Sequence, residues 1–126
     1  MGNVGFHETR IFKKAYSLAM VIFEASKSFP IEERFALTDQ IRRSSRSICS
    51  NFAEGYRKRR YKKYFISKVT DSDAECSETI VWIHFAFDCG YLKKDFADKI
   101  IKEYQEVGKM IGGILKNPES FMSRTQ

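Results

Sequence analysis

The residues best suited to chemistry with an anion form one basic, tyrosine-rich run near the middle of the chain. Six of the seven residues from 57 to 63 are Lys or Arg, and tyrosines lie within and beside them. Guanidinium and ammonium groups neutralise phosphates, and a tyrosine ring can stack on an unpaired base. The candidate nucleic-acid-binding residues are Arg42, Arg46, Tyr56, Arg57, Lys58, Arg59, Arg60, Tyr61, Lys62, Lys63 and Tyr64.

The positive charge of the chain is concentrated in this region. Residues 42–68 contain ten Lys or Arg and a single acid, Glu54, whereas the rest of the chain has twelve basic and fifteen acidic residues. The region is therefore +9 and the remainder −3, within a net charge of +6. Charge segregated in this way attracts polyanions such as nucleic acid. The alternative interpretation is a solvated face that binds nothing.

Composition favours a helical protein. The chain has 126 residues, enough for one domain, and 43% of them are hydrophobic. Only two prolines and seven glycines are present, which suits long helices better than many short strands. The longest apolar run, residues 80–87, is too short to span a bilayer, and residues 1–14 do not resemble a secretory signal. We therefore expect a soluble, cytoplasmic protein.

The apolar residues recur at helical spacing in four segments. Thr38 is the predicted N-cap of the second segment, and Gly55 is its predicted C-terminal end. Four amphipathic helices with short connections pack most simply as an antiparallel up-down-up-down bundle, here a single domain over residues 1–126. The predicted all-α bundle has helices at about 9–28, 38–55, 60–88 and 95–115.

Polar residues interrupt the core-facing line of the third predicted helix. Residues 70–79 have almost no apolar content, although Ser72 and Thr79 lie on that line. A buried carboxylate there needs hydrogen-bond donors, and the second helix supplies them. One interpretation is a structural or assembly network that fixes helix register or subunit pairing. Solvated faces, or a ligand site, are the alternatives. The network candidates are Arg43, Asn51, Glu54 and Glu75.

Catalysis and metal binding are not indicated. The two histidines, His7 and His84, belong to no Glu-x-x-His pair, and the sequence has no glycine-rich phosphate loop. Three cysteines without CxxC spacing predict neither a zinc site nor a disulfide framework. We therefore expect no enzyme activity and no cofactor.

Additional apolar residues lie off the core-facing line of the third helix. Trp82 and Phe85 are the clearest of them. A helix that is apolar on more than one face is either central or shared with another chain. Trp82 and Phe85 are therefore candidates for an oligomer contact, with ordinary core packing as the alternative. Gly108, Gly112 and Gly113 on the last helix suggest a close helix contact as well.

These segments together resemble the four-helix-bundle family of bacterial 23S rRNA intervening-sequence proteins. The resemblance covers roughly residues 6–116, and the Asn-x-Ala-Glu-Gly block at 51–55 is its most specific part. The sequence departs from the usual pattern at Ser44-Ser45 and in the acidic stretch 71–79. The matching blocks are Phe29-Pro30 with Glu33, Leu37 with Gln40-Ile41-Arg42-Arg43, Ser47-Ile48 with Ser50-Asn51, Ala53-Glu54-Gly55, Ser72 with Glu75, Cys89-Gly90-Tyr91-Leu92 and Val107-Gly108-Lys109-Met110.

That family is similar to the accessory variability proteins of diversity-generating retroelements, which are basic pentameric bundles associated with a reverse transcriptase and nucleic acid. The resemblance implies a homo-oligomer, in particular a pentamer, without catalysis of its own. We therefore predict a nucleic-acid-associated protein that binds structured or single-stranded RNA. The alternatives are a protein-interaction module, acting as accessory subunit of an enzyme such as a reverse transcriptase, and a small-ligand protein.

Overall fold

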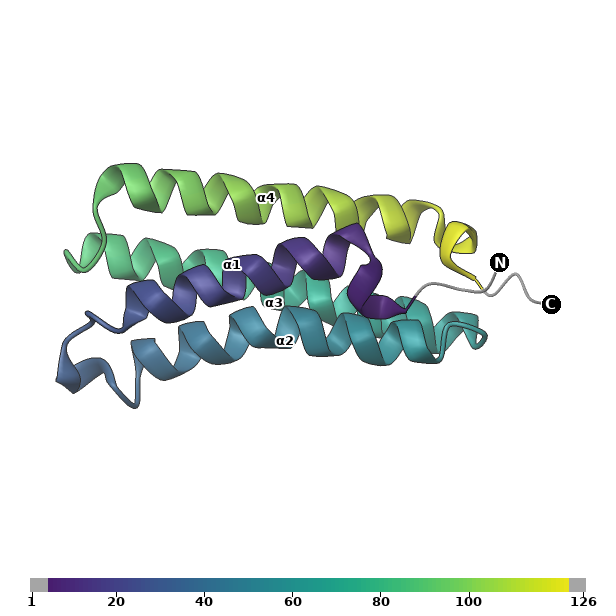
Figure 1. Ribbon diagram of the computed structural model, residues 1–126, viewed down its shortest axis with the longest axis horizontal. Helices are drawn as coiled ribbons and strands as arrows, with labels where there is room; N and C mark the ends of the chain where they lie inside the picture. Colours follow the sequence, from purple (N-terminus) through teal and green to yellow (C-terminus); the bar gives the residue numbers. More distant parts are fainter. Residues whose placement is uncertain (1–4, 123–126) are drawn as a thin grey trace.

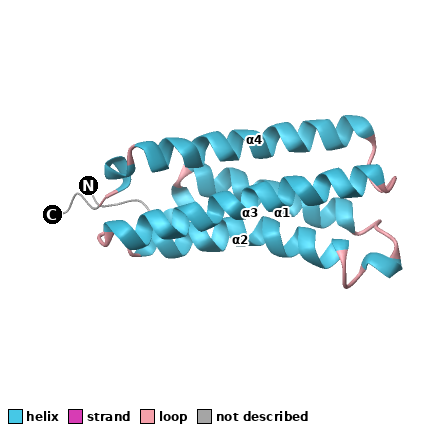
Figure 2. Cartoon of the chain, turned by 180° about the vertical axis from the view of Figure 1, so that it is seen from behind, coloured by secondary structure: helices cyan, strands magenta, loops and turns pink. Residues whose placement is uncertain are grey.

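The computed structural model describes residues 5–122 and confirms the all-α architecture. Four long helices run alternately up and down (Figure 1). Seen from behind, the described chain consists of helices joined by short loops (Figure 2). All predicted helix ends lie within two residues of the observed ones. The elements are η1 (Phe6–Glu8), α1 (Arg10–Ser26), η2 (Ile31–Glu33), α2 (Leu37–Arg57), α3 (Lys62–Asp88), α4 (Lys94–Lys116) and η3 (Pro118–Phe121).

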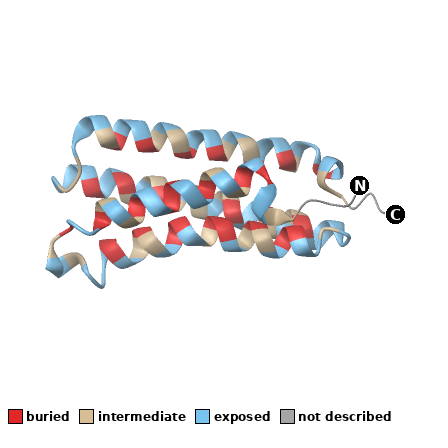
Figure 3. Ribbon diagram, viewed as in Figure 1, coloured by how far each residue is buried: buried red, intermediate tan, exposed pale blue. Residues whose placement is uncertain are grey.

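Each long helix buries one stripe against the others (Figure 3). On α1 the buried line contains Ile11, Ala15, Leu18 and Ile22, while the neighbouring Tyr16 is exposed. Helix α2 packs most extensively against α3, and α1 lies diagonally across the bundle from α3. Among residues 5–122, no helix is both long enough and apolar enough to cross a membrane.

Hydroxyl groups occupy part of the α2–α3 contact. Ser72 Oγ donates to the carbonyl oxygen of Ile48 at 2.8 Å, and Thr79 Oγ1 donates to Ser44 Oγ at 2.8 Å. Ser44, Ser72 and Thr79 are fully buried, as the core-facing line predicts for the latter two. A buried hydroxyl is costly without a partner, so these bonds explain why serine is accepted at Ser44.

The start of α2 differs from the prediction. Thr38 is not the N-cap; it lies in the first turn and is buried. The backbone N–H of Leu37 donates instead to the Glu33 carboxylate at 3.2 Å. Glu33 also accepts a hydrogen bond of 2.8 Å from the Tyr91 hydroxyl. This side chain, from outside the helix, therefore satisfies a free N–H of α2 and ties the α1–α2 connection to the end of α3.

The end of α2 also differs from the prediction. Gly55 does not end the helix, which continues to Arg57. A Cβ at Gly55 would lie 2.8 Å from Lys68 Cβ and 3.4 Å from the Phe65 carbonyl oxygen on α3. The glycine is therefore required by the close approach of two backbones. By contrast, Gly90 has φ +84° and ends α3 as predicted.

We expect Gly55→Ala to destabilise the protein by about 1–3 kcal/mol, because the new methyl group has to push α3 away from α2. The measurement is urea unfolding followed by circular dichroism. Gly112→Ala is the matched control, since nothing lies within 4 Å of a Cβ at that helical position. It should stabilise the chain by up to about 1 kcal/mol. Equal effects of the two substitutions would contradict the close-approach explanation.

Candidate nucleic-acid interface

The connection patch consists of the six basic residues at the α2–α3 turn and in the first turn of α3. Five of the six side chains are exposed, and that of Arg59 is partly buried. The patch lies at the end of the bundle where α1 begins and α4 ends (Figure 1). Its members are Arg57, Lys58, Arg59, Arg60, Lys62 and Lys63.

Aromatic rings hold several of these cations in place. The Arg59 guanidinium lies 3.9 Å from the centroid of the Tyr56 ring and donates to the Tyr56 carbonyl oxygen at 2.9 Å. Lys58 Nζ is 5.1 Å from the Tyr64 ring centroid, and the Arg60 guanidinium is 5.5 Å from that of Tyr61. These contacts orient the side chains without cancelling their charge.

The three predicted stacking tyrosines differ in their accessibility. Tyr61 and Tyr64 are exposed, so their rings are available to a base. Tyr56 is only 6% exposed and packs against Phe52 and Phe121 in the core. The prediction that Tyr56 stacks on a base is therefore wrong; its ring positions Arg59 instead.

The connection patch is electrostatically unbalanced. Within residues 5–122, only Lys62 of the patch forms an ion pair, with Glu119 of η3. Lysines elsewhere are paired more often, as in Lys14–Glu103 and Lys94–Asp98. The remaining patch cations have no carboxylate partner in the described part of the chain, and all of them except Arg59 are exposed. They therefore retain a positive field that attracts an anion.

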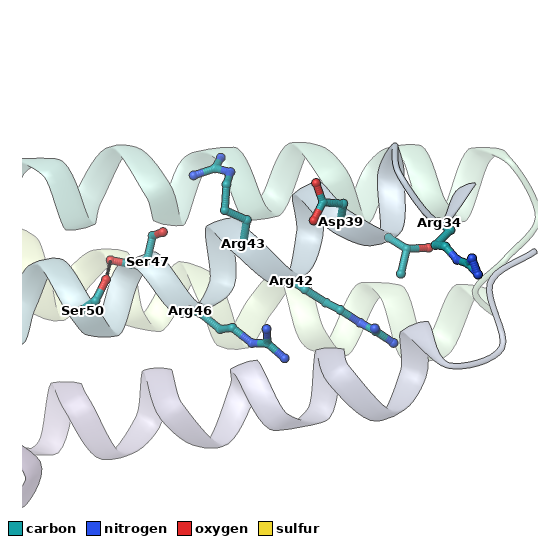
Figure 4. A pocket seen from close by; sticks show the side chains of 8 residues that line it. Arg34, Asp39, Arg42, Arg43, Arg46, Ser47 and Ser50 are labelled. Carbon is teal, nitrogen blue, oxygen red and sulfur yellow. Dashed lines mark hydrogen bonds between the residues drawn. The ribbon is translucent and has the colours of Figure 1, made fainter. Parts of the chain in front are cut away.

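A second basic surface, the arginine groove, lies in the N-terminal half of α2. It is an open hollow of about 540 Å³. Arg42 and Arg46 point from α2 toward α1, whereas Arg43 points toward α3 (Figure 4). Arg42 Nε donates to Ser26 Oγ at 2.8 Å, and its guanidinium lies 4.8 Å from the Phe23 ring centroid. The lining residues are Arg34, Thr38, Asp39, Arg42, Arg43, Arg46, Ser47 and Ser50.

The two basic surfaces are separate. Arg57 follows Arg46 by eleven positions of α2, or roughly 16 Å along the helix axis. Arg34 completes the arginine groove from the α1–α2 connection, and sequence analysis missed it because it lies outside the basic region. The only sequence feature that could have indicated Arg34 is its position, three residues before the start of the basic helix α2.

The predicted polar network is divided into two parts. Arg43 pairs with Glu75 at 3.3 Å and also with Glu78, which sequence analysis missed. Glu54 pairs instead with Lys68 at 2.9 Å. Asn51 is half-buried, and its side chain has no hydrogen bond within residues 5–122. The structure therefore brings together Arg43 and Glu75, but not Asn51 or Glu54 with them.

Glu78 is the centre of the larger part. The Trp82 indole Nε1 donates to Glu78 Oε2 at 3.0 Å, and Arg43 donates to the same oxygen. Burial by itself raises the pKa of Glu78, but the hydrogen bonds from Trp82 and Arg43 and the charge of Arg43 outweigh it. The pKa of Glu78 is therefore below its usual value. The hydrogen bond to Glu78 likewise raises the pKa of Arg43.

Comparison with known families decides the classification. Residues 7–113 match the model of the 23S rRNA-intervening sequence protein family, and this span includes every candidate residue described above. The chain belongs to this family.

A solved structure is consistent with this membership. A protein of unknown function from the S23 ribosomal protein family of Bacteroides thetaiotaomicron has a similar fold, with a TM-score of 0.76 and 25% sequence identity. The superposition covers 85% of this family member and 99% of the Bacteroides chain. No curated protein matches the chain.

The candidate oligomer contact of this family member lies on α3. Trp82 is partly buried and hydrogen-bonded to Glu78, and its ring centroid is 5.8 Å from that of Phe85. Phe85 is 53% exposed and Val81 is 46% exposed. Phe85 and Val81 therefore form an apolar surface that faces away from the core, while Trp82 belongs partly to the polar network. A Cβ at Gly108, Gly112 or Gly113 would meet nothing within 4 Å, so no contact inside the described chain explains these glycines.

The cysteines and carboxylates form no metal site in the described part of the chain. No group of three His, Cys, Asp or Glu side chains within residues 5–122 could hold a metal ion. Cys49 and Cys76 are buried, and burial raises the pKa of each thiol to about 11. Both therefore behave as apolar core residues at neutral pH.

We expect Glu78→Gln to make the folding stability of this family member less dependent on pH in the acid range. A carboxylate whose pKa is lowered in the folded state stabilises the fold at pH values above its unfolded-state pKa of 4.5. This stabilisation disappears as the pH falls through the folded-state pKa. Urea unfolding between pH 3 and 7 should therefore show a smaller loss of stability for the variant than for the wild type. At pH 7 the variant should be less stable by about 1 kcal/mol.

Glu106→Gln is the control for loss of a carboxylate, because Glu106 lies 3.7 Å from Lys109 on the exposed face of α4. This variant should keep the wild-type pH profile. An E78Q profile that coincides with that of the wild type would show that the Arg43–Glu78–Trp82 group does not couple protonation to folding.

Proposed function

We propose that this chain is a non-enzymatic, homo-oligomeric protein that binds structured or single-stranded RNA through the connection patch. The observation that supports this most directly is the uncompensated charge of the patch. Two other cations of the basic region, Arg43 and Lys68, are paired with acids of α2 and α3. The connection patch keeps its charge at an exposed end of the bundle.

The chemistry of the patch suits a nucleic-acid backbone. Arginine guanidinium groups donate several hydrogen bonds to phosphate oxygens, and Lys58 and Lys63 add positive charge without an ion pair in residues 5–122. Tyr61 and Tyr64 place accessible rings beside these cations. Such a surface binds by charge and stacking, so it favours RNA shape or unpaired bases over duplex sequence.

Self-association would strengthen this binding. A homo-oligomer, which by family resemblance is a pentamer, repeats the connection patch once in each copy. Binding of one patch then raises the effective concentration of RNA at the next. The outward apolar surface of α3 at Val81 and Phe85 is the contact that we propose for assembly.

Replacing Arg57, Arg59, Arg60, Lys62 and Lys63 with Gln tests the patch. We expect an unchanged fold and an affinity for RNA at least about 100-fold lower, because up to five phosphate contacts are lost. The plot of log affinity against log salt should become shallower by about one unit for each lost contact. Fluorescence anisotropy with labelled structured and single-stranded RNA at several salt concentrations measures both quantities.

The control for net charge replaces five exposed cations of the α4 segment with Gln: Lys93, Lys94, Lys99, Lys102 and Lys109. Its affinity should decrease far less, since these cations lie away from the connection patch. Equal losses of affinity in the two variants would show that binding depends on net charge and not on the connection patch. Unchanged affinity of the patch variant would refute the RNA-binding assignment.

Phe85→Lys tests the assembly contact. A charge at this exposed position is tolerated by a single chain but is costly in a dry interface. We expect the mass measured by sedimentation velocity to fall toward that of one chain, 14.7 kDa. Val21→Lys is the control, because Val21 is an exposed apolar residue on α1. An oligomer that survives F85K would place the contact elsewhere.

A second candidate function is a protein-interaction module, an accessory subunit of an enzyme such as a reverse transcriptase. The apolar surface of α3 favours it, since another protein could cover that surface as well as a second copy. Capture from lysate before and after nuclease treatment separates the two functions. A protein partner retained after nuclease supports the interaction module, and loss of all partners supports binding through RNA.

A further inference from the structure

An aromatic groove between α1 and α2 adjoins the arginine groove. We propose that a single-stranded nucleic acid binds across the two, with its phosphates in the arginine groove and a base in the aromatic groove. This inference rests on the proposed function and narrows its ligand to unpaired strands. It also assigns a binding site on a surface that is separate from the connection patch.

The arginine groove has the donors that a phosphate chain needs. Arg46 is exposed and has no carboxylate partner within residues 5–122, while Arg42 is held in place by Ser26 and Phe23. Arg34 adds a third guanidinium from the α1–α2 connection, and Ser47 and Ser50 add hydroxyl groups. Asp39 is the one carboxylate among the described residues that line this groove. The arginines therefore outnumber it, even though Arg43 is neutralised by α3.

The aromatic groove has a volume of about 410 Å³, and its lining is mostly apolar. The Phe12 ring centroid lies 5.1 Å from that of Phe6 and 5.8 Å from that of Tyr16, so three rings form a row. Tyr16 is 55% exposed, and Met20 beside it is 45% exposed. This groove therefore offers aromatic and thioether surface to a flat, partly apolar ligand.

Two residues line both grooves, Arg46 and Ser50. A ligand that reaches from one groove into the other must therefore combine an anionic part with a flat apolar part. A nucleotide strand has this combination, and proteins that bind single strands use cationic grooves beside aromatic rings. A duplex does not fit as well, because its bases are paired and their faces are already stacked.

The outer face of α2 can connect this site with the connection patch. At 100° per residue, Arg46 and Arg57 are only about 20° apart around the helix. Ser50 and Ala53 lie between them on nearly the same line, and their small side chains leave the path open. A strand that keeps the 3.4 Å step of stacked B-form DNA spans this separation of roughly 16 Å with about five nucleotides. A strand longer than this can therefore contact both basic surfaces.

The test uses two 12-nucleotide single strands, one with bases and one abasic, which have the same number of phosphates. We expect the wild type to bind the strand with bases about tenfold or more tightly than the abasic strand. Tyr16→Leu keeps an apolar side chain but removes the ring. Its affinity for the strand with bases should therefore fall about tenfold, and its affinity for the abasic strand should not change. Arg46→Gln should weaken both strands equally and reduce the salt slope by about one.

Two controls match these substitutions. Phe87→Leu removes an exposed ring on α3, and Lys102→Gln removes an exposed cation on α4. Both should bind the two strands as the wild type does. Circular dichroism and sedimentation of every variant verify that fold and assembly are unchanged.

The outcomes separate this inference from the proposed function. Y16L and R46Q could bind both strands like the wild type while the connection-patch variant still has a lower affinity for RNA. The two-groove site would then be wrong, and the proposed function would stand. Equal affinity of the wild type for the two strands also refutes the base site. If the wild type binds neither strand nor structured RNA, the proposed function fails together with this inference.

Discussion

The close contact between α2 and α3 is the constraint on which the rest of the structure depends. It requires small or hydroxyl-bearing residues where the helices meet, namely Ser44, Gly55 and Ser72. Each hydroxyl there donates or accepts a buried hydrogen bond, so the contact is satisfied as well as tight. With this side of α2 fixed against α3, the opposite side must face outward. The exposed positions of Arg46 and Arg57 are a direct consequence of this packing.

The same contact divides the basic charge into two classes. Basic side chains at the α2–α3 contact meet acids across it, as Arg43 of α2 does with Glu75 and Glu78 and as Lys68 of α3 does with Glu54. Side chains at the turn and on the α1 side of α2 meet no such acids in residues 5–122. The +9 region of the sequence is therefore partly neutralised where the helices pack and remains positive elsewhere. This explains how an acidic α3 and a basic α2 coexist in one bundle.

The extent of the four helices could be predicted because apolar periodicity and Gly90 are local signals. The role of Gly55 could not, since a C-terminal glycine and a close-contact glycine look the same in sequence, and Lys68 on α3 decides between them. The start of α2 was assigned to Thr38 for a similar reason. The first backbone N–H of the helix, that of Leu37, donates to the carboxylate of Glu33, which lies outside the helix.

The candidate site shows the same limit. A helical wheel gives the direction of Arg43 but not its partners, so Glu75 was predicted and Glu78 was missed. Tyr56 was predicted to be accessible because it adjoins a charged run, yet the aromatic cluster with Phe52 buries it. The aromatic groove was also missed. Two adjoining apolar lines run along α1, and only the packed bundle shows that Tyr16 lies on the line left open.

The arrangement of the four helices allows binding and assembly to occupy different sides of the molecule. Helix α1 lies diagonally across the bundle from α3, because each packs against α2 and α4. The aromatic groove is lined by α1, α2 and η1 and contains no described residue of α3, where Val81 and Phe85 lie. A second copy bound at Val81 and Phe85, near the end of α3, would leave the aromatic groove and the connection patch at the start of α3 accessible. Self-association would then add nucleic-acid-binding surfaces to the assembly instead of covering them, which is the condition under which avidity increases with each copy.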